Sequence, residues 1–351
     1  GLSALLVSTS KQMQFFVEHA RKNKMNIPIL CGGAAINSNY INRIAKEDGI
    51  YEPGVFYCNT MFEGLKTMDT LISDEKPKLL ADWKEKLENW KEKSTATVDP
   101  ANLPKSDIKP VSAPTPKTIG EPIRLKADQI KMDEVWQLID KKSLFKLSWG
   151  LRGKAGSESE ADHEQLLSQW KIRIIREKLF EPEVVYGYFK CHNKDGKLSV
   201  ENPHGDDVSF DFPRSTKPEH LCLTDYFGDD DVVAFQAVTV GNKVADIIEQ
   251  WNKEDKYTDA YYLHGLAVEV AEGLAEWINR KIKSELNLDA GGLRYSWGFP
   301  SCPDVLQHQL VWKLLEPEKS GMELTESGQI IPEQSTAAIV VHHPKASYFV
   351  L

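Results

Sequence analysis

The chain has 351 residues, 41% of them hydrophobic, and its formal net charge is −9 at pH 7. The length allows two domains, the acidic balance argues against nucleic acid as the main partner, and the lack of a long apolar run argues against a membrane span. Five scattered cysteines without a C-x-x-C pair exclude zinc-finger spacing and favour a reducing, cytoplasmic setting over a disulfide scaffold.

Residues 1–75 alternate short apolar runs with amphipathic stretches. Strands are expected at Gly1–Val7, Ile27–Leu30 and Gly54–Cys58. Helices are expected at Lys11–Asn23, Ser38–Glu47 and Met61–Ile72. Short strands that alternate with helices are typical of a parallel sheet with right-handed crossovers. This part therefore predicts an α/β segment.

Residues 76–122 indicate a domain boundary. Asp74–Lys93 is charged and predicts a helix, with Trp83, Leu87 and Trp90 on one stripe. Ser94–Pro122 contains six prolines among serine, threonine and lysine. Such a composition buries little apolar surface, so we expect an extended, semi-rigid linker.

Residues 123–351 have a mixed pattern that predicts an α+β domain with a largely antiparallel sheet. Helices are expected at Asp133–Asp140, Ser159–Leu179 and Lys256–Ser284. Strands are expected at Glu183–His192, Lys197–Glu201, Val208–Phe212 and Asp231–Val240, the first two joined by a hairpin turn at 193–196. The apolar stripe of the longest helix is predicted to be core rather than a cofactor site. It comprises Leu263, Leu266, Ala267, Val270, Leu274, Trp277 and Ile278.

A proline-rich segment near the C-terminus presents one fixed cation. Arg294 stands four residues before Gly298, and Pro300 and Pro303 follow. We expect a rigid irregular loop, because each proline locks φ and glycine allows unusual conformations. A guanidinium on such a loop binds a carboxylate bidentately. The alternative is an ordinary surface loop whose arginine forms a salt bridge.

The same residues resemble a known family. Arg294–Asp304 follows the pattern R-x-x-x-G-[YF]-P-x-C-P-[DE], which resembles the S-adenosylmethionine-binding signature in the activation domain of cobalamin-dependent methionine synthase. Tyr295-Ser296-Trp297 replaces the usual Pro-Ala-Pro of that family. Further segments resemble the family in the same order: Leu138–Lys154, Val184–Phe189 with Gly205–Val208, Cys222–Phe227, Gly321–Ser327, and His343–Pro344 with Ser347–Phe349.

The resemblance implies reductive reactivation of cobalamin. In the family, S-adenosylmethionine donates a methyl group to cobalt after an electron arrives from a flavodoxin-like donor, and this regenerates methylcobalamin for methyl transfer from methyltetrahydrofolate to homocysteine. Carried over by position, Asp140 accepts from the ligand's ammonium and Arg294 pairs with its carboxylate. The backbone near Ser296 contacts adenine or ribose, and Tyr348 and Phe349 close the pocket. No catalytic residue and no metal ligand is assigned to this chain.

Residues 1–75 resemble the C-terminal half of the family's cobalamin-binding Rossmann-like, or flavodoxin-like, domain. The resemblance places Gly32 and Gly33 at a close approach to cobalamin and Ser3, Val7 and Thr60 beside its dimethylbenzimidazole tail. The family's cobalt-coordinating motif D-x-H-x-x-G does not occur here. We therefore expect an incomplete cobalamin site, with the rest of that domain and the folate and homocysteine domains upstream.

Two classes of function follow. The first is the reactivation portion of a methionine synthase, and the second is a non-catalytic, degenerate activation module that caps a separate corrinoid protein. Calorimetric titration with S-adenosylmethionine distinguishes them, because a degenerate module gives no heat of binding. A conventional methyltransferase or a serine hydrolase is disfavoured, since neither a G-x-G-x-G loop after a first strand nor a G-x-S-x-G elbow occurs.

Overall fold

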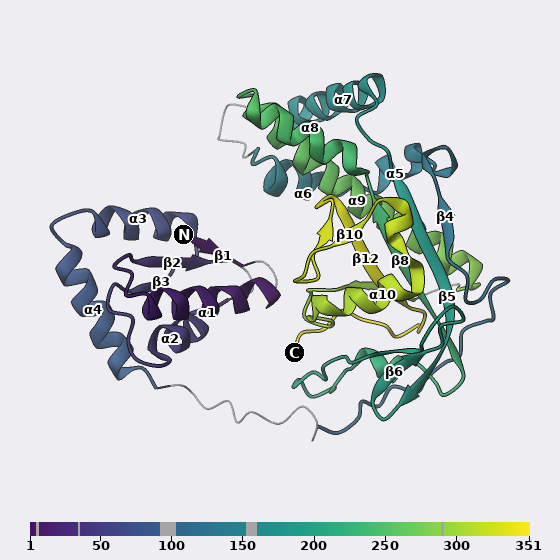
Figure 1. Ribbon diagram of the computed structural model, residues 1–351, viewed down its shortest axis with the longest axis horizontal. Helices are drawn as coiled ribbons and strands as arrows, with labels where there is room; N and C mark the ends of the chain where they lie inside the picture. Colours follow the sequence, from purple (N-terminus) through teal and green to yellow (C-terminus); the bar gives the residue numbers. More distant parts are fainter. Residues whose placement is uncertain (5–6, 34–35, 92–102, 152–159, 289–290) are drawn as a thin grey trace. The chain divides into compact units, whose positions relative to one another are not determined.

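The computed structural model describes residues 1–4, 7–33, 36–91, 103–151, 160–288 and 291–351 (Figure 1). The beginning of the predicted linker and the end of the segment Leu138–Lys154 lie outside these residues. Contacts divide the chain into two compact units. One consists of residues 1–103 with 298–304, and the other of residues 104–297 with 305–351.

The first unit contains a three-stranded parallel sheet in the order β1-β2-β3. Its strands are β1 (Leu2–Ser3), β2 (Ile29–Gly32) and β3 (Val55–Tyr57), and its helices are α1 (Val7–Lys22), α2 (Ser38–Lys46), α3 (Met61–Leu71) and α4 (Lys76–Asn89). Alternate strand residues face opposite sides of the sheet. Ile29 and Val55 share a core with α1 and α2, whereas Leu30 and Phe56 pack with α3 and α4. The predicted α/β segment is confirmed.

The first strand is shorter than predicted. It ends at Ser3, and Val7 begins α1 instead of ending the strand. In α1, Met13, Val17 and Ala20 are buried at helical spacing. The prediction of one strand over Gly1–Val7 was wrong because a short apolar run does not distinguish a buried strand from the start of a helix.

The second unit is built on a seven-stranded antiparallel sheet in the order β7-β6-β5-β8-β12-β9, with β4 paired to β5. Its strands are β4 (Ile123–Leu125), β5 (Glu183–Lys194), β6 (Lys197–Val200), β7 (Val208–Phe210), β8 (Asp231–Thr239), β9 (Leu293–Ser296) and β12 (Ser335–Val341). A small hairpin joins β10 (Glu323–Leu324) to β11 (Ile330–Ile331). The predicted turn joins β5 to β6, with positive φ at both Asp195 and Gly196. The predicted antiparallel α+β part is thus confirmed.

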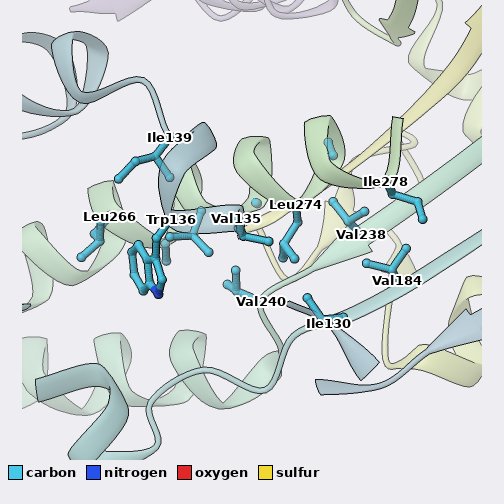
Figure 2. Close-up of a cluster of buried hydrophobic side chains, with 14 of the residues drawn as sticks. Ile130, Val135, Trp136, Ile139, Val184, Val238, Val240, Leu266, Leu274 and Ile278 are labelled. Carbon is cyan, nitrogen blue, oxygen red and sulfur yellow. The ribbon is translucent and has the colours of Figure 1, made fainter. Parts of the chain in front are cut away.

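The helices of the second unit are α5 (Met132–Leu138), α6 (Lys141–Ser143), α7 (Glu160–Glu177), α8 (Asn242–Lys253), α9 (Tyr257–Glu285) and α10 (His308–Leu315), with a π-helical turn at Leu144–Ser148. The predicted stripe of α9 is buried except for Trp277, which is half-buried. Figure 2 shows Val135 of α5 and Leu274 of α9 in one core with Val184 and Val238 of the sheet. Helix α9 is therefore the element on which the other parts of this unit are assembled.

Candidate functional site

Arg294 lies on a strand rather than on the irregular loop that we predicted. In β9 it pairs with Val340 of β12, while its neighbour Tyr295 is buried. The predicted irregular segment begins only at Gly298, where φ is +92° and the amide donates to the Cys302 carbonyl at 2.9 Å. The expectation failed because β9 is four residues long and is formed by pairing with a strand over 40 positions later.

The Arg294 guanidinium is paired with two carboxylates of α9. Its Nη2 donates to Glu272 Oε2 at 2.6 Å, and its Nε lies 3.9 Å from Glu276 Oε2. The two glutamates are one helical turn apart, and Arg280 donates to Glu276 at 3.1 Å. The Arg294 side chain is 16% exposed, so its charge is only partly screened by water. The salt bridge that we considered as the alternative is therefore present.

The C-terminal segment brings Tyr348 to Arg294. The Tyr348 hydroxyl donates to the Arg294 carbonyl at 3.1 Å, and its ring packs edge-on against Tyr295 at 5.2 Å. Partial burial raises the pKa of Tyr348, the nearby carboxylates of Glu276 and Glu272 raise it further, and Arg294 opposes them. The ring is 67% exposed and leaves an open aromatic face. Phe349 follows and is half-buried.

Asp140 begins a helix instead of ending one. Helix α5 ends at Leu138, and the Asp140 Oδ1 accepts from the backbone amides of Lys142 at 2.9 Å and Ser143 at 3.1 Å. This is the hydrogen bonding of an N-cap residue, and it accounts for an aspartate at this position without a ligand. The side chain is nevertheless exposed, so it is accessible to one.

A buried glutamate of α9 lies near Asp140 and near Glu272, the partner of Arg294. Glu269 of α9 is 7% exposed and accepts from the hydroxyls of Ser143 at 2.7 Å and Ser148 at 3.1 Å. Burial raises its pKa, and the carboxylates of Asp140 and Glu272 raise it further. Asp140 and the partner of Arg294 thus both lie close to one turn of α9.

The structure therefore gathers Asp140, Arg294 and Tyr348 around the middle of α9, with Ser296 at the end of β9. Sequence reasoning missed Glu269 and Glu272. The signal for them is weak, because they stand three residues apart in an otherwise apolar stretch, V-E-V-A-E, where either is expected to be a surface charge.

The residues predicted to bind cobalamin lie at the carboxyl ends of the parallel strands, except Val7, which begins α1. Ser3 is opposite Gly32 in the register, and Thr60 follows β3 and caps α3 by accepting from the Glu63 amide at 3.2 Å. A Cβ atom on Gly33 would lie 2.2 Å from the Ala4 carbonyl oxygen. That glycine is explained by close packing of the chain on itself rather than by a cradle for a ligand.

The remaining sequence-based expectations concern reactive groups and membranes. Cys302 is buried, and burial raises its pKa, as expected for a packed thiol rather than a nucleophile. Among the described residues, no group of three or more His, Cys, Asp or Glu side chains is arranged to hold a metal ion. No helix in the same residues has the length and apolar character needed to cross a membrane.

Comparisons with known proteins agree with the resemblance. The family model for the activation domain of vitamin B12-dependent methionine synthase matches residues 131–351. Methionine synthases of Mycobacterium tuberculosis and Mycobacterium leprae are each 30% identical to the chain over 99% of its length. The chain spans about a third of the length of these curated relatives, 34% in each case.

A solved structure shares the fold. The reactivation domain of MetH, crystallised bound to AdoHcy, superimposes with a TM-score of 0.58 at 21% sequence identity. The match covers 68% of this chain and 83% of that one. At this level of identity the similarity establishes the architecture and leaves the ligand-binding residues to be argued from the geometry.

Proposed function

The chain belongs to the family defined by the activation domain of vitamin B12-dependent methionine synthase, and on that premise we propose that it binds S-adenosylmethionine beside the middle of α9. The bound ligand then serves the reductive methylation that restores methylcobalamin. The observation that supports this most is the convergence of Arg294, Asp140 and Tyr348 on α9.

The amino-acid end of the ligand fits the charges of this region. A guanidinium has five N–H donors, and among the described residues Arg294 uses one of them in a hydrogen bond, from Nη2 to Glu272. Its Nε also lies 3.9 Å from Glu276 Oε2, and we assign the remaining donors to the ligand's carboxylate. Asp140 is exposed and offers a carboxylate oxygen to the ligand's ammonium. Hydrogen bonds to charged groups contribute about 1.5–3 kcal/mol each, so two such contacts are enough to orient a small zwitterion.

The adenosine end is assigned to the end of β9 and the C-terminal segment. Ser296 is half-buried at the end of the strand, and the exposed ring of Tyr348 provides a flat apolar surface near Arg294. We assign the backbone near Ser296 to the adenine or ribose, and Tyr348 with Phe349 to closing the pocket. Holding the ligand at both ends is what methyl transfer requires, since the chemistry depends on how the sulfonium methyl is positioned.

Cobalamin, when bound, supplies the cobalt that accepts this methyl group after reduction by a flavodoxin-like electron donor, and it passes methyl groups from methyltetrahydrofolate to homocysteine. The residues of the first unit fit cobalamin only in part. Ser3 and Thr60 are exposed at the carboxyl ends of the strands, but the Thr60 hydroxyl caps α3 and Gly33 packs against Ala4. We therefore assign no chemical step to them, and we propose that further cobalamin, folate and homocysteine domains act together with this chain.

One observation favours the second candidate, a degenerate module that caps a corrinoid protein without binding S-adenosylmethionine. Arg294 already has a carboxylate partner at 2.6 Å in Glu272, and Tyr295 and Trp297 beside it are buried. The Glu272 carboxylate then pairs with the Arg294 guanidinium in place of a ligand's carboxylate.

Isothermal titration of the whole chain with S-adenosylmethionine tests the proposal. We expect measurable binding by the parent protein and a loss of affinity on the order of 2–4 kcal/mol in Arg294→Ala, because a charge-assisted pair is removed. Asp140→Asn should weaken binding less, since asparagine still caps α6. Arg280→Ala is the matched control, because it removes an exposed partner of the same Glu276. No heat of binding by a folded parent protein would instead support the degenerate module.

A further inference from the structure

Three residues of α9, spaced four apart, face the segment that contains Asp140. A Cβ atom on Gly265 would lie 3.1 Å from Ser148 Cβ, and one on Gly273 would lie 3.1 Å from the Val135 carbonyl oxygen. Glu269 lies midway between these glycines, on the same stripe of the helix. Both glycines allow close approach, so the segment from α5 through the π-helical turn lies tightly along α9. Glu269 places a buried ionisable side chain in that contact.

The Glu269 carboxylate holds the π-helical turn through a single oxygen. Its Oε1 accepts from Ser143 Oγ at 2.7 Å and from Ser148 Oγ at 3.1 Å. These serines are five residues apart, which is the hydrogen-bonding interval of a π-helix, so both hydroxyls reach the same acceptor. A turn of this kind is uncommon and recurs at functional sites. Here the turn is held in place by hydrogen bonds to the buried carboxylate of Glu269.

The same turn presents Asp140. The Asp140 Oδ1 accepts from the Ser143 amide at 3.1 Å, and the Ser143 hydroxyl donates to Glu269. Ser143 therefore connects the exposed carboxylate of Asp140 to the buried carboxylate of Glu269. Among the described residues, Asp140 Oδ2 makes no hydrogen bond and is left to face solvent or a ligand.

We propose that Glu269 is a positioning residue for ligand binding: it fixes the turn that presents Asp140, and its negative charge lies beneath the position of the ligand's ammonium. This inference rests on the proposed function, because it specifies how the amine end of the same ligand is held. The consequence is an affinity that depends on whether Glu269 is ionised.

Two carboxylates lie near Glu269. Asp140 precedes α6, and Glu272, which pairs with Arg294 of β9, lies on α9 itself. The two carboxylates repel a third negative charge, whereas a bound ammonium attracts it. Binding of the ammonium therefore favours ionised Glu269, and protonation of Glu269 at low pH weakens binding.

The other titratable groups near the turn are engaged elsewhere. Lys141 donates to Glu164 of α7 at 2.8 Å. The ring of His163 on α7 packs against Phe145 at 5.4 Å, and His264 of α9 is hydrogen-bonded to Gln334. Lys142 is exposed. These groups are the same in the parent protein and in a Glu269 variant, so the ratio of the two affinities isolates Glu269.

The test is calorimetric titration of the whole chain with S-adenosylhomocysteine at pH 5, 6, 7 and 8. The parent's affinity should rise with pH through the raised pKa of Glu269 and then level off. Glu269→Gln keeps an acceptor oxygen for both serines, so its affinity should approach the parent's as the pH falls, lack the rise, and be about tenfold weaker at pH 8, the equivalent of one pKa unit of coupling. Glu164→Gln, which removes a carboxylate from the other side of α6, should follow the parent.

A second ligand and a second variant separate charge from positioning. Methylthioadenosine lacks the amino-acid end, so its affinity should be the same in the parent and in Glu269→Gln at every pH. Replacing both serines, Ser143→Ala with Ser148→Ala, should weaken S-adenosylhomocysteine binding several-fold at all four pH values. A Glu269→Gln protein that reproduces the parent's affinity and pH profile would overturn this inference alone. Failure of the folded parent to bind S-adenosylhomocysteine at any pH would overturn the proposed function as well.

Discussion

Arg214 and Asp225 form an ion pair that is almost shielded from water, with side chains 11% and 7% exposed. Arg214 Nη2 donates to Asp225 Oδ1 at 2.8 Å, and the Ser106 hydroxyl donates to Asp225 Oδ2 at 2.7 Å. Burial alone would raise the pKa of Asp225, but Arg214 and Ser106 hold it below its ordinary value. This pair explains the aspartate of the segment Cys222–Phe227, which resembles a family motif but lies outside the candidate site.

We predict that Arg214→Ala lowers the free energy of unfolding by about 3–5 kcal/mol at pH 7, because it leaves a buried carboxylate unpaired. A lowered carboxyl pKa stabilises the fold above the ordinary aspartate value of about 3.9, and that contribution is lost as pH falls through the lowered pKa. Urea unfolding at pH 7 and pH 3 should therefore show a smaller difference between variant and parent at pH 3. Lys197→Ala is the control, since its pair with Asp211 is exposed and worth less than about 1 kcal/mol. An equal difference at both pH values would contradict the prediction.

At the scale of single elements, α9 packs against its neighbours at its glycines, which have no side chain, as well as through the large side chains that it buries. At Gly273 the helix has no side chain, and the Val135 carbonyl oxygen and Ile139 Cγ2 of the α5 segment occupy that space. Alanine is the better helix former by about 1 kcal/mol. A Cβ atom added at Gly273, however, would lie 3.1 Å from the Val135 carbonyl oxygen, closer than ordinary van der Waals contact, so the added methyl has to displace α5.

Gly273→Ala should therefore destabilise the protein by about 1–3 kcal/mol, the usual cost of overpacking a core. Gly64→Ala in α3 is the matched control, because the nearest atom to the added Cβ is 3.9 Å away. That variant should be neutral or stabilising by up to about 1 kcal/mol, as helix propensity alone predicts. Chemical denaturation followed by circular dichroism measures both variants. Two stabilised proteins would show that helix propensity outweighs packing at Gly273.

The elements also show which features can be predicted from sequence. Helix α9 and the β5–β6 hairpin were predicted because their signals are local: a long helical period, and a turn with Asp195-Gly196. Strand β9 was missed because it forms only by pairing with β12. The role of Glu269 was missed because its hydrogen-bond partners, Ser143 and Ser148, come from a distant segment that packs on α9. Asp140 was proposed only through a family resemblance, since its own context indicates no ligand, whereas Arg294 was first proposed from the proline-rich loop that we expected around it.

At the scale of the whole molecule, part of the predicted linker is a strap on the second unit. We call residues 104–122 the strap. The Ala113 amide donates to Asp231 at 2.9 Å, the Gly120 amide donates to the Tyr188 carbonyl at 2.7 Å, and His342 Nε2 lies 2.6 Å from the Val111 carbonyl oxygen. Its proline-rich composition predicted an extended conformation, but these partners are separated from it by more than 60 residues of sequence. Packing between segments so far apart in the sequence produces no local sequence pattern from which it could be predicted.

We expect His342→Ala to release the strap while the sheet remains folded. His342 is 2% exposed, and its Nε2 faces both the Val111 carbonyl oxygen, at 2.6 Å, and the Asp231 carboxylate, at 3.4 Å. The variant leaves a buried carbonyl without its donor and removes the side chain beside the Asp231 carboxylate, at a cost of about 1–3 kcal/mol. Hydrogen exchange measured by mass spectrometry on the whole chain should show faster exchange in the strap, at the amides of Ala113 and Gly120, and unchanged protection in β5 and β8.

His204→Ala is the control for this experiment, because it removes a histidine whose side chain is 54% exposed and pairs with Glu121 at the end of the strap. An exposed pair of this kind contributes less than about 1 kcal/mol, so exchange in the strap should stay at the parent rate. If His342→Ala exchanged as slowly as His204→Ala, the strap would be held by its remaining contacts, at Ser106, Ala113 and Gly120, rather than by the histidine. The strap's attachment would then be distributed along its length, and no single substitution would detach it from the sheet.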